Sequence, residues 1–365
     1  MALVDSLPNS ALRDPEEYDA MDEAVRARAG SGARALGAQK QHEKLEKHGE
    51  LEKSEKSGKA ERPEKHRHPH RHYHHGWWWK TLVAGLALWI ATVAVTALTR
   101  NSSLISTLIL LGSFLIPFCV MLFVLERIGG NISKLHVIIA FFIGGICGVL
   151  GASLLEAKLT SSLYSYLGVG FIEEFIKALL LVIIGWRVMP KTAGLGALLG
   201  ATIGAGFAAF ESAGYAFKAA ITAHGVDLLR LLQTEALRAI LAPVGHVLWT
   251  AILGAAIFGA ARGRTHFRPT LGILGAFVGV SLLHALWDSS IRLTALLALI
   301  LTGASVEHVD VGLIASPAVH AKTLAFVLFV SALAVTAAIG LATLWLILRH
   351  HRHSARNQHA SAPPA

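Results

Sequence analysis

Two adjacent glutamates, Glu173 and Glu174, lie near the middle of a hydrophobic stretch that is long enough to cross a membrane. A carboxylate at membrane depth is unfavourable unless it is protonated, paired or bound to a metal. Lys177 follows Glu173 by four residues, so it can neutralise one carboxylate on the same helical face. Glu173 and Lys177 alone could be a structural ion pair, but adjacent glutamates indicate a site for chemistry or ion handling.

A second set of polar residues lies on the next three apolar segments of the chain. Glu211 and Tyr215 are four residues apart, as are His284 and Asp288, so each pair projects from one helical face. At about 1.5 Å per residue, Glu211, His246 and His284 fall in the same half of the bilayer as the two glutamates. We therefore predict that these residues converge on one pocket. For Tyr215 an anchoring role at the membrane surface is the alternative, and Asp288 could be a solvated residue at a helix end.

Two histidines with one or two carboxylates match a hydrolytic zinc site, in which three protein ligands leave one position open for water. A nearby glutamate then accepts the proton of that water. A site without metal, in which a glutamate and a histidine activate water directly, remains an alternative. We predict Glu173 or Glu174 as the general base and Lys177 as the residue that sets their charge. The predicted metal ligands or water-orienting groups are Glu211, His246, His284 and Asp288.

The composition is that of an integral membrane protein. Hydrophobic residues make up 53% of the 365 residues and charged residues only 16%. Apolar blocks of about 20 residues fit bilayer-spanning helices. The formal net charge of +9 comes mostly from residues in the two ends of the chain and in short loops, so we expect no nucleic-acid partner. Cys119 and Cys147 both lie in apolar segments and fit no disulfide or zinc-knuckle pattern.

We predict an all-α fold, a polytopic integral membrane bundle of about eight transmembrane helices, with the site on the helices within about 163–289. The stretch 292–303 is apolar but short, which favours an interfacial or re-entrant piece. The Leu-rich part of 218–238 is predicted to lie on the outer surface as an interfacial helix. Small residues at four-residue spacing in the fifth and seventh spans indicate close packing there. The predicted spans are 79–99, 104–125, 135–155, 163–186, 193–217, 239–261, 271–289 and 321–348.

The chain divides into three predicted parts. Residues 1–76 form a disordered, His/Lys/Glu-rich cytoplasmic tail, 77–349 the transmembrane protease-like domain, and 350–365 a short basic disordered tail. Six histidines between 66 and 75 could bind transition metals loosely, but a solvated, pH-sensitive tail is favoured. Arg127, Lys191 and other basic residues lie in loops on the side of the N-terminal tail. The positive-inside rule therefore predicts a multi-pass protein of the cell membrane with both termini in the cytoplasm.

Four short motifs follow one another, each on its own predicted helix. They are Glu173-Glu174-Phe-Ile-Lys177, Phe210-Glu211-Ser-Ala-Gly-Tyr215, His246 with Gly254 eight residues on, and His284-Ala-Leu-Trp-Asp288. In these motifs the chain resembles the PrsW family of intramembrane proteases, which belongs with the CAAX proteases and bacteriocin-processing membrane proteins. The resemblance covers about residues 130–290.

That resemblance implies peptide-bond hydrolysis within or beside the lipid bilayer. It implies Glu173 and Glu174 as the catalytic pair, and a membrane-anchored protein substrate, such as an anti-sigma factor cut at the outer side. We thus predict an intramembrane metallo- or glutamate-type endopeptidase, with zinc as the cofactor. The main rival is a proton-coupled transporter or ion channel that uses the same carboxylates and histidines. Transporters often contain inverted repeats, and none is visible here. A third possibility is a scaffold that binds substrates without cutting them.

Overall fold

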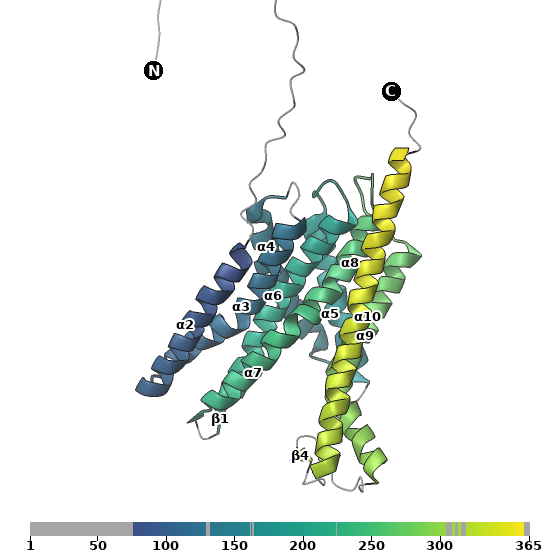
Figure 1. Ribbon diagram of the computed structural model, residues 1–365. Helices are drawn as coiled ribbons and strands as arrows, with labels where there is room; N and C mark the ends of the chain where they lie inside the picture. The colour runs from purple at the N-terminus through teal and green to yellow at the C-terminus, as the bar shows by residue number, and fades with distance from the viewer. Residues whose placement is uncertain are drawn as a thin grey trace, which may run out of the picture. The chain divides into compact units, whose positions relative to one another are not determined.

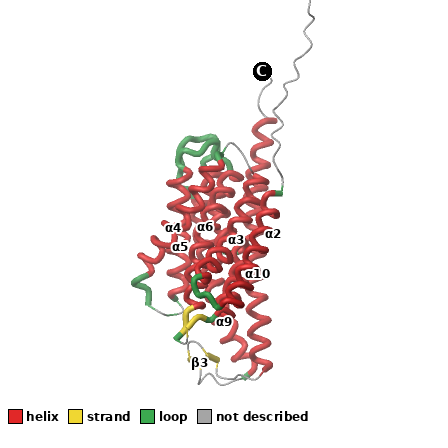
Figure 2. The backbone as a smooth tube through the Cα atoms, turned by 90° about the vertical axis from the view of Figure 1, so that its left-hand side faces the viewer, coloured by secondary structure: helices red, strands yellow, loops and turns green. Residues whose placement is uncertain are grey.

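The computed structural model describes residues 76–128, 132–160, 162, 164–223, 225–303, 309–310, 313–314 and 319–360. The helices lie side by side in a bundle (Figures 1 and 2), and two short antiparallel hairpins, β1–β2 and β3–β4, lie at one end of it. The predicted tail 1–76 lies, but for Gly76, outside the described residues. The elements are α2 (Trp77–Thr99), α3 (Leu104–Ile128), α4 (Lys134–Glu156), α5 (Ser165–Gly185), α6 (Ala193–Ala220), β1 (Ile221–Thr222), β2 (Gly225–Val226), α7 (Leu228–Leu241), the 3₁₀ turn η1 (Ala242–Val244), α8 (His246–Ala260), α9 (Leu271–Thr302), β3 (Val309–Asp310), β4 (Leu313–Ile314) and α10 (Val319–Ala360).

The polytopic all-α fold predicted from the sequence is confirmed. In the described chain, seven helical stretches are long and apolar enough to cross a membrane: α2, α3, α4, α6, the run from α7 through α8, α9, and most of α10. The eighth long helix, α5, has 21 residues. It differs from the seven in carrying three charged residues, Glu173, Glu174 and Lys177, and all three are buried inside the bundle. Ionisable residues in a membrane helix face the protein interior because exposing them to lipid hydrocarbon is unfavourable.

Helix α6 is the central element of the bundle, and nearly all of its first 17 residues are buried. It packs most extensively against α8, and next against α4 and α3. A Cβ atom added to Gly196 would lie 2.0 Å from the carbonyl oxygen of Gly254, and one on Gly200 would lie 2.1 Å from that of Thr250. Only glycine permits this distance, so the predicted close packing of the fifth span is confirmed.

Helix α9 differs from the prediction in two ways. It is one continuous helix of 32 residues, so 292–303 is its last part and not a separate interfacial or re-entrant piece. The hydroxyls of Ser290 and Thr294 donate to carbonyls of their own helix, so these polar residues do not interrupt it. Gly303, with φ of 67°, ends it in the left-handed conformation. The close packing predicted at the small residues of the seventh span is not found at Gly275, where an added Cβ would meet no atom within 4 Å.

Helix α7 is not the interfacial helix that its amphipathic sequence suggested. It packs on α3 and α6 and leads through η1 into α8, so the span predicted over 239–261 extends back to Leu228. Leu231 is buried in a cluster with residues of α3 and α6. Glu235 is 3% exposed and accepts a 2.8 Å hydrogen bond from the indole N–H of Trp89 in α2. The helix joins the bundle because its polar residues have partners there.

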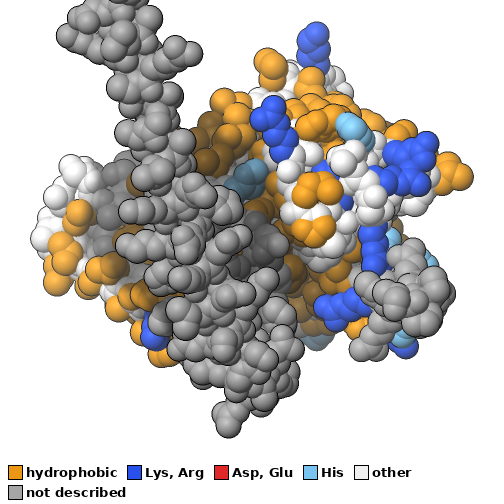
Figure 3. Space-filling view, turned by 90° about the horizontal axis from the view of Figure 1, so that it is seen from above, with side chains coloured by type: hydrophobic (Ala, Val, Ile, Leu, Met, Phe, Trp, Pro, Cys, Tyr) orange, Lys and Arg blue, Asp and Glu red, His pale blue; other side chains and the backbone are white. Residues whose placement is uncertain are grey.

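The start of α2 and the end of α10 lie at the same end of the bundle (Figure 1). Seen from that end, Lys and Arg side chains are scattered over the surface, and no acidic side chain is visible among the described residues (Figure 3). Helix α10 continues to Ala360, past residue 349, where the membrane domain was predicted to end. Arg262 ties it to the α8–α9 loop by donating to the carbonyl oxygen of His351.

Lys191, in the loop between α5 and α6, is one of the basic residues on which the predicted orientation rests, and it is only 1% exposed. Its Nζ donates to the carbonyl oxygens of Gly185, Trp186 and Val188, at 3.0 to 3.2 Å. These oxygens lie at or just past the end of α5, where carbonyls have no partner within the helix. The amine also lies 4.1 Å from the ring centre of Phe267. Lys191 therefore caps the helix that carries the paired glutamates.

Replacing Lys191 with Met should lower the free energy of unfolding by about 2–3 kcal/mol, because the side-chain volume is kept while charge-assisted hydrogen bonds are lost. A thermal-shift measurement on the detergent-solubilised chain would detect the change. Lys158→Met, at an exposed lysine, is the matched control and should leave the melting temperature unchanged. Equal melting temperatures for the two variants would show that the cap contributes nothing.

Candidate active site

The predicted residues from α5, α8 and α9 meet in the interior of the bundle. Helices α5 and α9 approach closely because Gly170 faces the backbone: an added Cβ would lie 2.6 Å from the carbonyl oxygen of Ser281. His284 lies at this contact, with its Cβ 3.4 Å from the added atom, and Glu174 lies one turn along α5 from Gly170. The His284 Nδ1 lies 3.0 Å from the Glu174 Oε1. The side chains thus meet because small residues allow the helices to touch.

Lys177 lies at the centre of the polar cluster and is fully buried. Its Nζ donates to Glu173 Oε2 at 3.0 Å and to Glu174 Oε1 at 2.8 Å, so it bridges the two carboxylates. It also lies 2.9 Å from His246 Nδ1 and 4.0 Å from the ring centre of Phe207. A lysine amine only donates, so His246 Nδ1 accepts here and the ring proton is assigned to Nε2.

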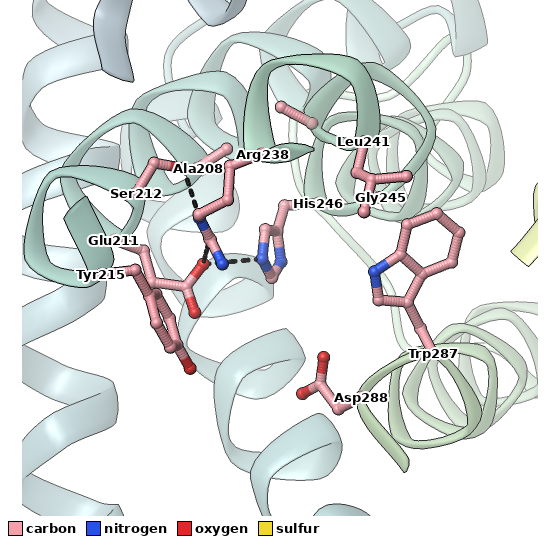
Figure 4. A pocket seen from close by; sticks show the side chains of 11 residues that line it. Ala208, Glu211, Ser212, Tyr215, Arg238, Leu241, Gly245, His246, Trp287 and Asp288 are labelled. Atoms are coloured by element: carbon pink, nitrogen blue, oxygen red, sulfur yellow. Dashed lines mark hydrogen bonds and ion pairs between the residues drawn. The ribbon is translucent and has the colours of Figure 1, made fainter. Parts of the chain in front are cut away.

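The Nε2 of His246 lies 2.9 Å from Glu211 Oε2. Arg238 of α7 pairs with the same carboxylate oxygen and donates from its Nε to Ser212 Oγ at 2.7 Å, as Figure 4 shows. Its guanidinium carbon also lies 4.4 Å from the ring centre of Tyr215. Arg238 therefore fixes Glu211, which in turn orients His246.

Arg238 is a site residue that the sequence reading missed, because it lies in a segment assigned to the membrane surface. The available signal was its position two turns before His246 on an amphipathic helix with an adjacent proline, Pro243. Neither feature identifies a site residue unless the packing of α7 is known.

His284 lies between the paired glutamates and Asp288. Its Nε2 is 3.3 Å from Asp288 Oδ2 and 3.6 Å from Glu173 Oε2, yet it makes no hydrogen bond with any described residue. Its ring lies 4.6 Å from that of Trp249 and 5.0 Å from that of His246, measured between centres. The Trp249 ring packs against both imidazoles, and this packing limits their rotation.

Two cavities reach this cluster. The larger has a volume of about 540 Å³, lies between α4, α5, α6 and α9, and is lined by Glu173, Glu211 and Asp288 at its inner end. The smaller, of about 70 Å³, is lined by Arg238, His246, Glu211 and Asp288 (Figure 4). Glu174 lines neither and is fully buried. Of the two adjacent glutamates, Glu173 is therefore the one that a molecule in the larger cavity would contact.

Three side chains of the cluster carry donor atoms close enough together to bind one metal ion. In the described residues, Glu173, His246 and His284 form a group whose donor atoms all lie within 4.8 Å of one another. Donors of a tetrahedral zinc site lie about 3.3 Å apart, so small shifts suffice. The unpartnered Nε2 of His284 offers a free lone pair in the tautomer whose proton is on Nδ1. Binding at His246 Nδ1 would require Lys177 to turn away.

The structure thus brings the predicted residues together, but in unequal positions. Glu173, Glu174, Lys177, His246 and His284 form the centre. Glu211 is engaged by Arg238, and Asp288 lies beside His284 where both cavities end. Tyr215 is 48% exposed and serves as a ring beneath Arg238, at the edge of the cluster.

Comparison with known proteins gives one match. The family model described as PrsW family intramembrane metalloprotease matches residues 132–319, just over half of the chain, from just before α4 to the start of α10. No curated protein and no solved structure matches.

Proposed function

The chain belongs to the PrsW family of intramembrane metalloproteases. We therefore propose that it hydrolyses a peptide bond of a membrane-anchored protein, such as an anti-sigma factor, close to the outer surface of the cell membrane. One observation carries the proposal. Glu173 lines a cavity of about 540 Å³ and at the same time lies within 4 Å of imidazole nitrogens from two other helices. A carboxylate that is both accessible and flanked by imidazoles is suited to activate water.

Glu173 accepts the proton of the attacking water in this proposal. The water oxygen adds to the carbonyl carbon of the substrate peptide, and the proton moves to the Glu173 carboxylate. When the C–N bond breaks, the same proton passes to the amine nitrogen that leaves. His246 and His284 flank the reacting atoms and orient the water.

The remaining residues position these groups. Glu174 holds His284 through its Nδ1 and shares the charge of Lys177 with Glu173. Lys177 keeps the two adjacent carboxylates together, which would otherwise repel each other in a medium of low dielectric constant. Arg238 acts through Glu211 on His246.

We propose zinc as the metal of this site. His246, His284 and one oxygen of Glu173 would hold it, since two imidazoles and one carboxylate are a usual donor set of catalytic zinc, and the other oxygen of Glu173 would remain to accept the proton. When bound, zinc lowers the pKa of a water molecule and polarises a carbonyl group.

We further propose that the end of the bundle where α2 begins faces the cytoplasm. The Lys and Arg side chains on that face support this orientation (Figure 3). The larger cavity extends toward the other end, to Glu156 and Lys218 near the ends of α4 and α6, so cleavage would occur on the outer side.

Reconstitution separates this proposal from a proton-coupled transporter. The full-length chain is placed in liposomes with a panel of single-pass membrane proteins and a pH-sensitive dye in the lumen. We expect new protein termini, identified by mass spectrometry, near the membrane-spanning segments of some panel members, and no change in dye signal beyond that of empty liposomes. A dye response without any new termini would contradict hydrolysis and favour transport.

A further inference from the structure

Helices α4 and α6 are in contact at one level of the bundle and separate at the next. A Cβ on Gly206 would lie 1.9 Å from the carbonyl oxygen of Phe141, and one on Gly145 would lie 2.7 Å from that of Gly206. Eight residues further along α6, a Cβ on Gly214 would meet no atom within 4 Å. The two helices therefore diverge toward the outer end of the bundle.

The larger cavity fills the space where they diverge. On each helix, four of the lining residues have the spacing of a single helical face, i, i+3, i+4 and i+7. These residues are Val149, Ala152, Ser153 and Glu156 of α4, and Glu211, Gly214, Tyr215 and Lys218 of α6. The walls thus combine small and apolar side chains with polar ones, and charged residues lie at the two ends.

The helix register places Glu156 at the outer mouth of this cleft. Gly145 packs against Gly206, and both helices run in the same direction, so Glu156 is level with the residues around Lys218. The seven residues from Glu211 to Lys218 advance by about 10 Å along the helix. An extended peptide covers that distance in about three residues.

The two charged residues at the mouth differ in their surroundings. Lys218 is exposed and its Nζ lies 5.8 Å from the ring centre of Tyr215, on its own helix. The Oε1 of Glu156 is shielded from solvent and has no hydrogen-bond partner among the described residues. A shielded carboxylate oxygen without a partner is unfavourable, so it is suited to bind a cationic group.

We propose that the substrate chain enters between α4 and α6, and that Glu156 selects a Lys or Arg about three or four residues from the scissile bond. Glu156 at the mouth and Asp288 inside carry carboxylates that pair with no Lys or Arg among the described residues, which favours a basic segment. This inference rests on the proposed protease function, and the experiment below distinguishes the failure of one from the failure of the other.

The reconstituted panel is digested with the wild-type chain and with Glu156→Gln, Glu156→Lys and Glu173→Gln. Wild-type cuts that Glu173→Gln abolishes should have Lys or Arg within about four residues on the outer side. Glu156→Gln should slow these cuts about 10-fold, which corresponds to the loss of one hydrogen bond to a charged group. In a cleaved panel member whose basic residue is changed to Glu, Glu156→Lys should restore cleavage.

A steric pair of variants tests the route. Gly214→Leu fills the cleft and should slow every Glu173-dependent cut at least about 10-fold, while Gly275→Leu, at an equally open glycine on α9, should not. Thermal-shift measurements on both variants serve as the check that they fold. If Gly214→Leu cuts like the wild type, the route between α4 and α6 is wrong.

The outcomes separate the two proposals. If cuts depend on Glu173 but show no basic preference, or if Glu156→Lys leaves the preference unchanged, the selectivity of Glu156 is refuted and the protease function stands. If no cut depends on Glu173, the catalytic proposal fails and the selectivity inference fails with it.

Discussion

Replacing Glu173 with Gln is expected to lower the rate of peptide cleavage about 10²- to 10⁴-fold, which is the usual contribution of general-base catalysis. Glutamine keeps the size of the side chain and can still accept a hydrogen bond from Lys177. It cannot accept the proton of the attacking water. The measurement is the initial rate of appearance of new termini from a panel protein that the wild-type chain cuts.

Two further substitutions make the result specific to Glu173. Glu174→Gln should reduce the rate less, by about 10- to 100-fold, because Glu174 lines neither cavity and acts by holding His284. Glu235→Gln is the matched control: it is also a buried acid within the bundle, and glutamine can still accept from the indole of Trp89. Its rate should equal that of the wild type. Wild-type cleavage by Glu173→Gln would remove this residue from the mechanism.

The second large effect is expected from His246→Ala and His284→Ala, each of which should lose one equivalent of bound zinc per chain and at least about 10³ in cleavage rate. Each substitution removes one of three donors in the same group. Metal content by elemental analysis gives a readout that does not depend on activity. Because the six histidines at 66–75 can bind metal too, the relevant quantity is the difference between variant and wild-type full-length chains.

His136→Ala is the control for these measurements, since His136 lies on α4 near the other end of the bundle. It should leave both metal content and rate unchanged. Removal of the metal by a chelator should stop cleavage by the wild-type chain, and added zinc should restore it. If the wild-type chain and both histidine variants hold the same amount of metal, His246 and His284 do not bind it.

The eight long helical stretches of the described chain, with α7 and α8 taken as one, were predictable from the sequence because each hydrophobic segment has the length that a bilayer requires. The wrong predictions concern segments whose local sequence pattern is compatible with two structures. The Leu-rich face of α7 could cover either lipid headgroups or other helices, and only the partners of Glu235 and Arg238 decide for the bundle. The end of α9 was separated from the rest because a span was expected to end near Asp288. Its hydroxyl side chains bond within the helix, so it continues.

For the site, the sequence supplied the residue types and their helical faces, and so the chemistry of two imidazoles with adjacent carboxylates. Glu173, Glu174, Lys177, His246 and His284 were named from spacing and depth, because polar side chains in a membrane helix are rare and must face an interior. Which of the adjacent glutamates faces the cleft was decided only by the tertiary structure. It depends on the rotation of α5 against α9, which the contact of Gly170 with Ser281 fixes.

The amino-acid sequence by itself determined that this chain spans the membrane as a helical bundle and which side chains are available for hydrolysis, since both follow from local composition. The tertiary structure decided that Lys177 bridges the two carboxylates, that Arg238 belongs to the site and that α4 and α6 open a cleft beside Glu173. These features arise from contacts between residues far apart in the chain. Such contacts depend on how closely glycine-bearing helices approach and at what register, which helical periodicity leaves undetermined.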